Sequence, residues 1–497
     1  MDRIDPVEGM TARKRLRRAR SGAWSVCAVV LGLGVVAPWG GAAHAAVVLE
    51  QFQGGGFSGF VPPDMGGAVG NGYVVQLLNG VATIDTTTGT QVSQTSLNAV
   101  FGGISGQLSD PRVIFDPASQ RWFASAITVP GGSTGNPNSI LLAVSTGANP
   151  TAGFTTLSFA SANNTTFADF PTLGVNGAAV TIGTNDFSTS TGNFIASSLY
   201  SIPKSDLTGA TPTLANQSSF TNSGSIGSTP QAVTTASGTG TSTSVLSTGT
   251  SGGTPVYALS TVSGANAAGA SLALTQTYNA TAIASAGLTG TGLVAPTQPG
   301  GATYDPGDPR ISSGAYQAGN NIYFANAVAN ATSGATSDLI AWGVLNATSS
   351  GVVASGTLSL AGLSLTYPSI SANADGTFVI AFNGSGTGTD ITDYYVVCSA
   401  VTATCGAPQI AYTSPASDYS VAPAGTNRWG DYSWTTVDPT NPTNFWLFQE
   451  YALTNSNWGT VITEIGTAVP EPATIALFGV GLIGLGLARR RPRAAAR

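Results

Sequence analysis

Residues 46–465 consist of short apolar runs separated by clusters of Gly, Asn, Asp and Pro. The runs are rich in Val, Ile, Thr, Tyr and Phe, and no helical periodicity continues through them. Short runs of these residues, bounded by turn-forming residues, are typical of β-strands. The pattern therefore predicts an all-β body.

One theme recurs within this body. Most copies open with Asp and Pro, run through apolar residues, turn at polar or Gly positions and re-enter an aromatic or β-branched strand. Clear copies begin at residues 62, 110, 169, 308, 367 and 428, and a weaker copy occupies 230–248. Repeats of this length indicate blades arranged around an axis. We expect a β-propeller of six or seven four-stranded blades, because the coils of a parallel β-helix would repeat every ~20–25 residues.

One segment fits the theme poorly. Residues 208–254 are rich in Ser, Thr and Gly and nearly uncharged. Such a composition buries little apolar surface by itself. We expect this segment to be either a low-complexity insert or a weak blade of the propeller.

The C-terminal end has three parts in a fixed order. A linker at 466–472 is followed by an uncharged, mostly apolar run at 473–488 and a basic tail at 489–497. A helix over the apolar run would cover roughly 24 Å, so it spans a bilayer core of about 30 Å only if the flanking arginines reach the headgroups. The basic tail predicts a cytoplasmic C-terminus for this transmembrane helix.

This end of the chain resembles the PEP-CTERM sorting signal of Gram-negative bacteria. The residues that carry the resemblance are Val469, Pro470, Glu471 and Pro472, and in the basic tail Arg489, Arg490, Arg491 and Arg493. The resemblance implies a protein that is exported, held in the inner membrane by its C-terminal helix and processed by an exosortase-type enzyme. It then implies a location at the cell surface or outside the cell.

The N-terminal end agrees with export. Six basic residues lie between residues 13 and 20, an apolar stretch covers 23–38, and the small residues Ala43 and Ala45 flank His44. This arrangement predicts a secretory signal peptide at 1–45, cleaved before Ala46 and therefore exported by the Sec machinery.

Removal of the signal peptide changes the chemistry that the chain offers. His44 is the only histidine, so the exported part has no imidazole for a catalytic triad or a histidine-based metal site. Between residues 46 and 472 lie twenty acidic residues and five basic ones, a formal charge of −15. Because phosphate binding needs clustered Lys and Arg, we expect no nucleic-acid partner.

Two cysteines remain after that cleavage. Cys398 follows a run rich in Tyr and Val, and Cys405 precedes a glycine. In an oxidising compartment this pattern predicts a hairpin closed by a disulfide bond. The alternative, a metal site, would have only two thiolates and no histidine.

The body also resembles a group of secreted bacterial propeller proteins that are loosely sialidase-like in fold. The runs PPDMGGAVGNGYVVQLLN, SDPRVIFDPASQRWFA, DFPTLGV and RWGDYSWTTVDP carry this likeness. It implies the propeller but no particular chemistry.

Three arginines are the candidates for ligand binding. Arg112 and Arg310 occupy similar places in two Asp-Pro-Arg triplets, and Arg428 lies at the start of another unit. Together in a central funnel they would bind carboxylates bidentately, as the arginine cluster of sialidases does. Alternatively, each arginine forms a salt bridge to Asp110, Asp308 or Asp431.

Aspartates beside Pro, Gly or Asn either cap turns or bind calcium, and the sequence assigns no other cofactor. A glycosidase would need two carboxylates held about 5–9.5 Å apart, and Glu450 is one candidate.

We therefore expect an exported binding or scaffolding protein of the surface or biofilm matrix, with polysaccharide as its ligand and no assigned catalytic residue. The alternatives are a hydrolase or lyase acting on acidic glycans and a purely structural matrix protein.

Overall fold

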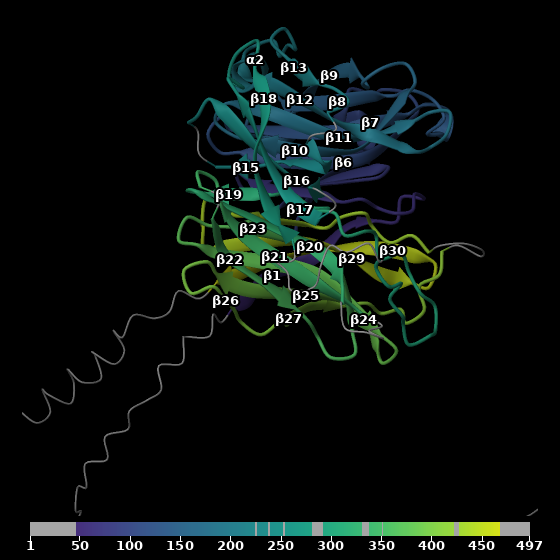
Figure 1. The fold of residues 1–497 in the computed structure, drawn as a ribbon. Helices are drawn as coiled ribbons and strands as arrows, with labels where there is room; N and C mark the ends of the chain where they lie inside the picture. The colour runs from purple at the N-terminus through teal and green to yellow at the C-terminus, as the bar shows by residue number, and fades with distance from the viewer. Residues whose placement is uncertain are drawn as a thin grey trace, which may run out of the picture. The chain divides into compact units, whose positions relative to one another are not determined.

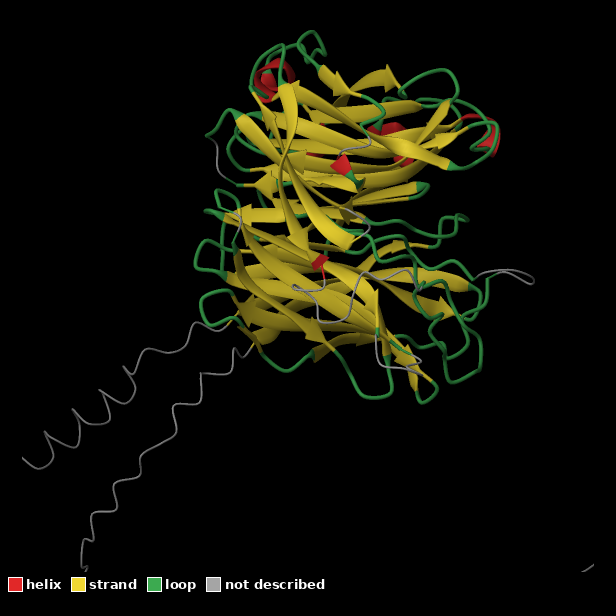
Figure 2. Cartoon of the chain, in the orientation of Figure 1, coloured by secondary structure: helices red, strands yellow, loops and turns green. Residues whose placement is uncertain are grey.

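The computed structural model describes residues 46–223, 226–236, 239–251, 254–280, 292–330, 337–349, 351–421 and 427–467. These residues form seven β-sheets with at least four strands each. Strands dominate the cartoon in Figure 2. The fold is a seven-bladed β-propeller, which confirms the predicted all-β class (Figure 1).

The first three blades follow one another along the chain. Blade 1 contains β2 (Gly66–Gly70), β3 (Tyr73–Leu78), β4 (Val81–Thr86) and β5 (Gln91–Ser96). Blade 2 contains β6 (Gln107–Asp116), β7 (Arg121–Val129), β8 (Ser139–Ser145) and β9 (Phe154–Ala160). Blade 3 contains β10 (Thr166–Val175), β11 (Ala179–Ser188), β12 (Phe194–Pro203) and β13 (Ser218–Phe220).

The next three blades repeat this order with small irregularities. Blade 4 contains β14 (Ser228–Ala232), β16 (Ser242–Ser251), β17 (Thr254–Ser263) and β18 (Ser271–Asn279). Blade 5 contains β19 (Tyr316–Ala318), β20 (Asn321–Ala329), β21 (Asp338–Asn346) and β22 (Val352–Leu358), and β15 (Thr234–Thr235) pairs in parallel with β19. Blade 6 contains β23 (Ser364–Ala372), β24 (Thr377–Gly386), β25 (Thr389–Ser399), β26 (Thr404–Cys405) and β27 (Gln409–Thr413).

Blade 7 joins the two ends of the body. It contains β28 (Trp434–Val437), β29 (Asn444–Thr454), β30 (Asn457–Thr467) and, as its outermost strand, β1 (Ala46–Gly56). The strands β1 and β30 are antiparallel, and Ala46 lies opposite Thr467. The first strand of the body therefore closes the ring.

Helical segments are short among the described residues. They are α1 (Leu97–Val100), α2 (Lys204–Thr208) and the 3-10 turns η1 (Pro130–Gly132) and η2 (Pro150–Ala152). Within the described ranges, no helix has the length and apolar character needed to cross a bilayer. The predicted signal peptide at 1–45 and the predicted transmembrane helix at 473–488 lie outside these ranges.

In blades 2, 3, 4 and 6 the recurring sequence theme corresponds to a β-bulge on the innermost strand. Asp110, Phe170, Thr229 and Tyr367 each precede a proline and have φ between 48° and 57°. Each lies at a register shift between the first two strands of its blade. A residue before proline avoids the right-handed helical region, and a positive φ in a non-glycine residue is strained. The bulge repeats because the same dipeptide geometry repeats.

Neighbouring blades approach closely near the axis. A Cβ atom on Gly66 of β2 would lie 2.7 Å from Cα of Arg112 in β6, and one on Gly174 of β10 would overlap the Ala232 carbonyl of β14. Since both obstacles are backbone, only glycine permits this spacing.

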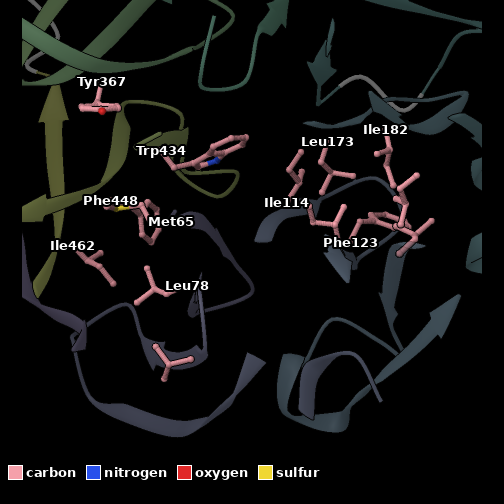
Figure 3. Packing of buried hydrophobic residues seen from close by; sticks show 14 of the residues in the cluster. Met65, Leu78, Ile114, Phe123, Leu173, Ile182, Tyr367, Trp434, Phe448 and Ile462 are labelled. Carbon is pink, nitrogen blue, oxygen red and sulfur yellow. The ribbon is translucent and has the colours of Figure 1, made fainter. Parts of the chain in front are cut away.

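The core lies between the faces of adjacent blades. Figure 3 shows Met65 and Leu78 near Phe448 and Ile462 on one side. On the other side, Ile114 and Phe123 of blade 2 face residues such as Leu173 of blade 3. The apolar face of each blade is thus covered by the neighbouring blade, and inner strands such as β2, β6 and β10 end their sheets at the axis.

The disulfide prediction is confirmed. Cys398 of β25 and Cys405 of β26 lie directly opposite each other and are bonded. The bond fixes the turn at the outer edge of blade 6.

Candidate functional site

Loop and bulge residues that precede or begin the inner strands form one cluster, which we call the channel mouth. Its members are Asp64, Asp110, Asp169, Phe170, Asp305, Asp308, Arg310, Arg428 and Asp431. Hydrogen bonds connect its members: the Asp431 N–H donates to Oδ1 of Asp64 at 2.9 Å, and the Phe170 N–H donates to Oδ2 of Asp110 at 3.1 Å. The side-chain Nδ2 of Asn79 donates a 2.7 Å hydrogen bond to Oδ2 of Asp64. The mouth therefore gathers residues from blades 1, 2, 3 and 7.

Arg112 lies beneath the mouth and is fully buried. Its Nε donates to the Pro171 carbonyl and its Nη2 to the Ser312 carbonyl, each at 3.0 Å. The guanidinium lies over the ring of Tyr432, 3.8 Å from the centroid. Arg112 thus links blades 2 and 3 to the segment before blade 5 across the axis, and no ligand in solvent can reach it.

Arg310 and Arg428 do lie at the mouth. Arg310 precedes β19 in a loop, where it contacts both carboxylate oxygens of Asp308 and lies 4.7 Å from the ring centroid of Phe170. Arg428 bonds to Asp431, and its Nε is 3.4 Å from Oδ2 of Asp305. Both arginines therefore have carboxylate partners within their own loops or close to them.

Carboxylates outnumber these cations. The six carboxylates of the mouth are Asp64, Asp110, Asp169, Asp305, Asp308 and Asp431. Burial, together with the charges of Asp110 and Asp431, raises the pKa of Asp169 to about 8. Burial and the Asp431 carboxylate likewise raise the pKa of Asp64 well above its usual range. The mouth therefore favours protons, cations or hydrogen-bond donors.

A recess opens beside Arg310. Its lining includes Phe170, Asp308, Arg310, Tyr367 and Asp431. The Tyr367 hydroxyl donates to the Asp305 carbonyl at 2.6 Å, which fixes the loop that carries Asp308. The recess therefore combines carboxylate acceptors with a guanidinium donor, and the largely buried rings of Phe170 and Tyr367 form part of its wall.

Sequence reasoning missed the two aromatic residues of this recess. Phe170 and Tyr367 occupy the position before the proline, where two other blades carry Asp110 and Thr229. The repeated position before proline could have identified these two residues. A bulge at this position directs the side chain away from the alternating pattern of the strand.

Other sequence candidates are enclosed. Glu450 is buried in β29, where its Oε2 accepts from the Gly430 N–H at 2.7 Å. Trp429, Trp434 and Trp446 are buried between blades. The side-chain carbonyl of Asn373 caps the turn before β24 by accepting from the Asp375 and Thr377 N–H groups.

The described ranges hold no cluster of three or more Asp, Glu, Cys or His side chains arranged to bind a metal ion. Ala46 is the first described residue, whereas Ala43, Ala45, the tetrapeptide at 469–472 and the basic tail at 489–497 lie outside the described ranges.

Residues 468–491 match the PEP-CTERM protein-sorting motif. Such a motif implies an exported precursor that is anchored in the membrane and processed by exosortase. No curated protein is similar to the chain in sequence.

Several solved structures are similar to the chain at low identity. A protein of unknown function from Dyadobacter fermentans is 8% identical, with 85% of this chain and 99% of that chain covered and a TM-score of 0.40. An α-L-arabinanase from Penicillium chrysogenum is 11% identical, with 84% and 98% covered and a TM-score of 0.38. A sialidase from Trypanosoma rangeli is 10% identical, with 83% and 60% covered and a TM-score of 0.32.

Proposed function

We propose that this chain, exported under its PEP-CTERM motif, is a protein of the cell surface or extracellular matrix whose channel mouth binds polysaccharide. The proposal rests on one observation. The Asp308 and Asp431 carboxylates and the Arg310 side chain line one recess, and the largely buried rings of Phe170 and Tyr367 form part of its wall. Sugars are recognised by such combinations of hydrogen-bonding groups and aromatic rings.

The charge of the mouth favours an uncharged glycan over an acidic one. Asp308 already occupies the bidentate face of Arg310, and Asp431 and Asp305 contact Arg428. An acidic sugar would have to displace these carboxylates and would approach the negative charge of the other aspartates. Sugar hydroxyls, in contrast, donate to carboxylates without displacing the arginines.

The test is a glycan array probed with purified residues 46–467, which contain all seven blades. We expect binding of uncharged glycans that Arg310→Met and Asp308→Asn each weaken at least about tenfold, roughly 1.4 kcal/mol. The matched control is Arg121→Met, because Arg121 bonds to the Ser145 carbonyl away from the mouth. An array with no bound glycan, from a folded protein, would leave the chain as a purely structural component.

Asp169 favours a second candidate function, hydrolysis. Asp169 lies close enough to Asp110 and Asp431 for their charges to raise its pKa, so a carboxyl group suited to general-acid catalysis has further carboxylates as neighbours, as glycoside hydrolysis requires. Released sugar from a bound polysaccharide, lost in Asp169→Asn while binding persists, would assign the chain to the glycoside hydrolases.

A further inference from the structure

The chain leaves the propeller for its sorting motif at the edge of blade 7. Thr467, the last residue of β30, is fixed by two hydrogen bonds to the Thr443 carbonyl, from its N–H at 2.9 Å and its Oγ1 at 2.8 Å. The matched motif starts at the next residue. Pro470 is three positions after Thr467 in the chain, so its Cα lies within about 11 Å of the Thr467 Cα whatever the conformation between them.

This short reach constrains the enzyme that reads the motif. An enzyme bound to residues 470–472 cannot avoid the propeller surface around Thr467. We call this surface the exit face and define it by Val47, Val48, Leu49 and Glu50 of β1, Glu464 of β30, and the loop at 438–444.

The exit face is apolar along β1. Val47, Val48 and Leu49 are 56%, 44% and 45% exposed. Val47 lies opposite Gly466 and Val48 opposite Ile465, so these side chains lie beside the last residues before the motif. Because side chains alternate along a strand, these three residues make both sides of the exposed end of β1 apolar, and such an edge is suited to contact with a partner.

The face is acidic beside this strip. Glu50 lies directly opposite Glu464, and both line a recess of about 340 Å³ together with Asp438. Like charges directly opposite each other destabilise a sheet. Burial and the charges of Asp438 and Glu50 raise the pKa of Glu464. No Lys or Arg is among the residues that line this recess.

We propose that the exit face is a docking surface for the membrane-embedded processing enzyme, and that a basic side chain of that enzyme enters the recess between Glu50 and Glu464. An arginine there would satisfy the carboxylates that oppose each other in the free propeller. The apolar side chains of Val47, Val48 and Leu49 would then pack against the enzyme surface around that arginine.

A phospholipid surface is the competing partner, and the charges disfavour it. Bilayer surfaces are neutral to negative, so they repel a face that carries Glu50, Asp438 and Glu464. The motif that the enzyme reads also begins one residue after Thr467, beside this face.

The test is the rate at which full-length precursor is processed in cells that contain the enzyme, followed by pulse-chase. In Glu50→Gln/Glu464→Gln the motif is unchanged and the like-charge pair is gone. We expect about tenfold slower processing, the effect of losing one desolvated charge contact. The midpoint of thermal unfolding stays equal or rises, which excludes misfolding as the cause.

The matched control is Ser158→Lys/Ala160→Lys, which changes the net charge by the same two units on exposed positions of β9. We expect its precursor to be processed at the wild-type rate. A second variant carries twelve Gly and Ser residues inserted between Thr467 and residue 468. The insertion should slow processing of the otherwise wild-type chain, and the two Gln substitutions should then have no further effect.

Equal processing of wild type and the double Gln variant would overturn the proposal. So would binding of the purified propeller to phosphatidylethanolamine and phosphatidylglycerol vesicles that requires Glu50 and Glu464, because it would assign the face to the membrane.

Discussion

Replacement of Arg112 by methionine tests whether the axis of the propeller is held by this buried cation. Methionine keeps most of the volume and removes both hydrogen bonds, leaving the Pro171 and Ser312 carbonyls without their partner. Each orphaned buried carbonyl costs about 1.5 kcal/mol, so we expect Arg112→Met to lower the free energy of unfolding by about 3 kcal/mol. Arg112→Ala adds a cavity and should cost about 5 kcal/mol.

Two further contacts support the direction of this effect. The guanidinium lies against the ring of Tyr432, and burial lowers the pKa of Arg112 while Asp110 and Asp64 favour its charged form. Its loss therefore leaves these carboxylates without their buried cation. Burial of the charged arginine itself costs free energy, and this cost reduces the net loss of stability when the arginine is removed. Methionine is chosen because it has a similar volume, so that no cavity adds to the measured effect.

The assay is urea unfolding of residues 46–467, followed by tryptophan fluorescence. Arg310→Met is the control, because its partly exposed ion pair with Asp308 contributes at most about 1 kcal/mol. If Arg112→Met unfolds at the same urea concentration as Arg310→Met, the desolvation penalty cancels the hydrogen bonds and the reasoning fails.

Three other predictions concern the pH response, the disulfide and the axis. Because the folded-state pKa of Asp169 is about 8, the folded protein holds a proton that the unfolded chain releases, so stability falls as pH rises from about 4 to 8. Asp169→Asn should flatten this fall in thermal midpoints measured from pH 4 to 9, and superimposable profiles would contradict it. Cys398→Ser/Cys405→Ser should cost about 2.5 kcal/mol in urea unfolding, from the entropy of an eight-residue loop, and an unchanged midpoint would refute that. Gly174→Ala should cost about 3 kcal/mol or more in the same assay, whereas Gly192→Ala, on a loop with open space, should show only the strain of its positive φ.

Much of the fold could be predicted from sequence because one local geometry repeats. The residue before proline, as in Asp110 and Phe170, sets a bulge on the inner strand of blades 2, 3, 4 and 6, and the bulge is visible in the sequence as a dipeptide. Blade 4, which contains Thr229, was harder to recognise in the sequence. Its strands are rich in the same Ser, Thr and Gly residues as its turns, so composition does not separate the two.

The candidate site was less predictable. Arg112 and Arg310 follow identical Asp-Pro dipeptides, yet Arg112 lies in β6 among aromatic rings and Arg310 lies in a loop before β19. A triplet specifies local backbone geometry, but the burial of its third residue depends on segments that lie far away in the chain, such as Ser312. For the same reason, the sequence of residues 46–56 does not predict that this strand pairs with β30.

Ring closure by β1 sets the timing of folding during export. Gly55 of β1 accepts a hydrogen bond from Thr460, which lies 405 residues later in the chain. At about 5–20 residues per second, roughly 20–80 s pass between the synthesis of these two residues. Throughout that interval the strand Ala46–Gly56 lacks β30, the strand with which it pairs, and the ring is completed only when this last strand arrives. A slow, late step of this kind makes the open ring the species most exposed to proteases and to pairing with another chain.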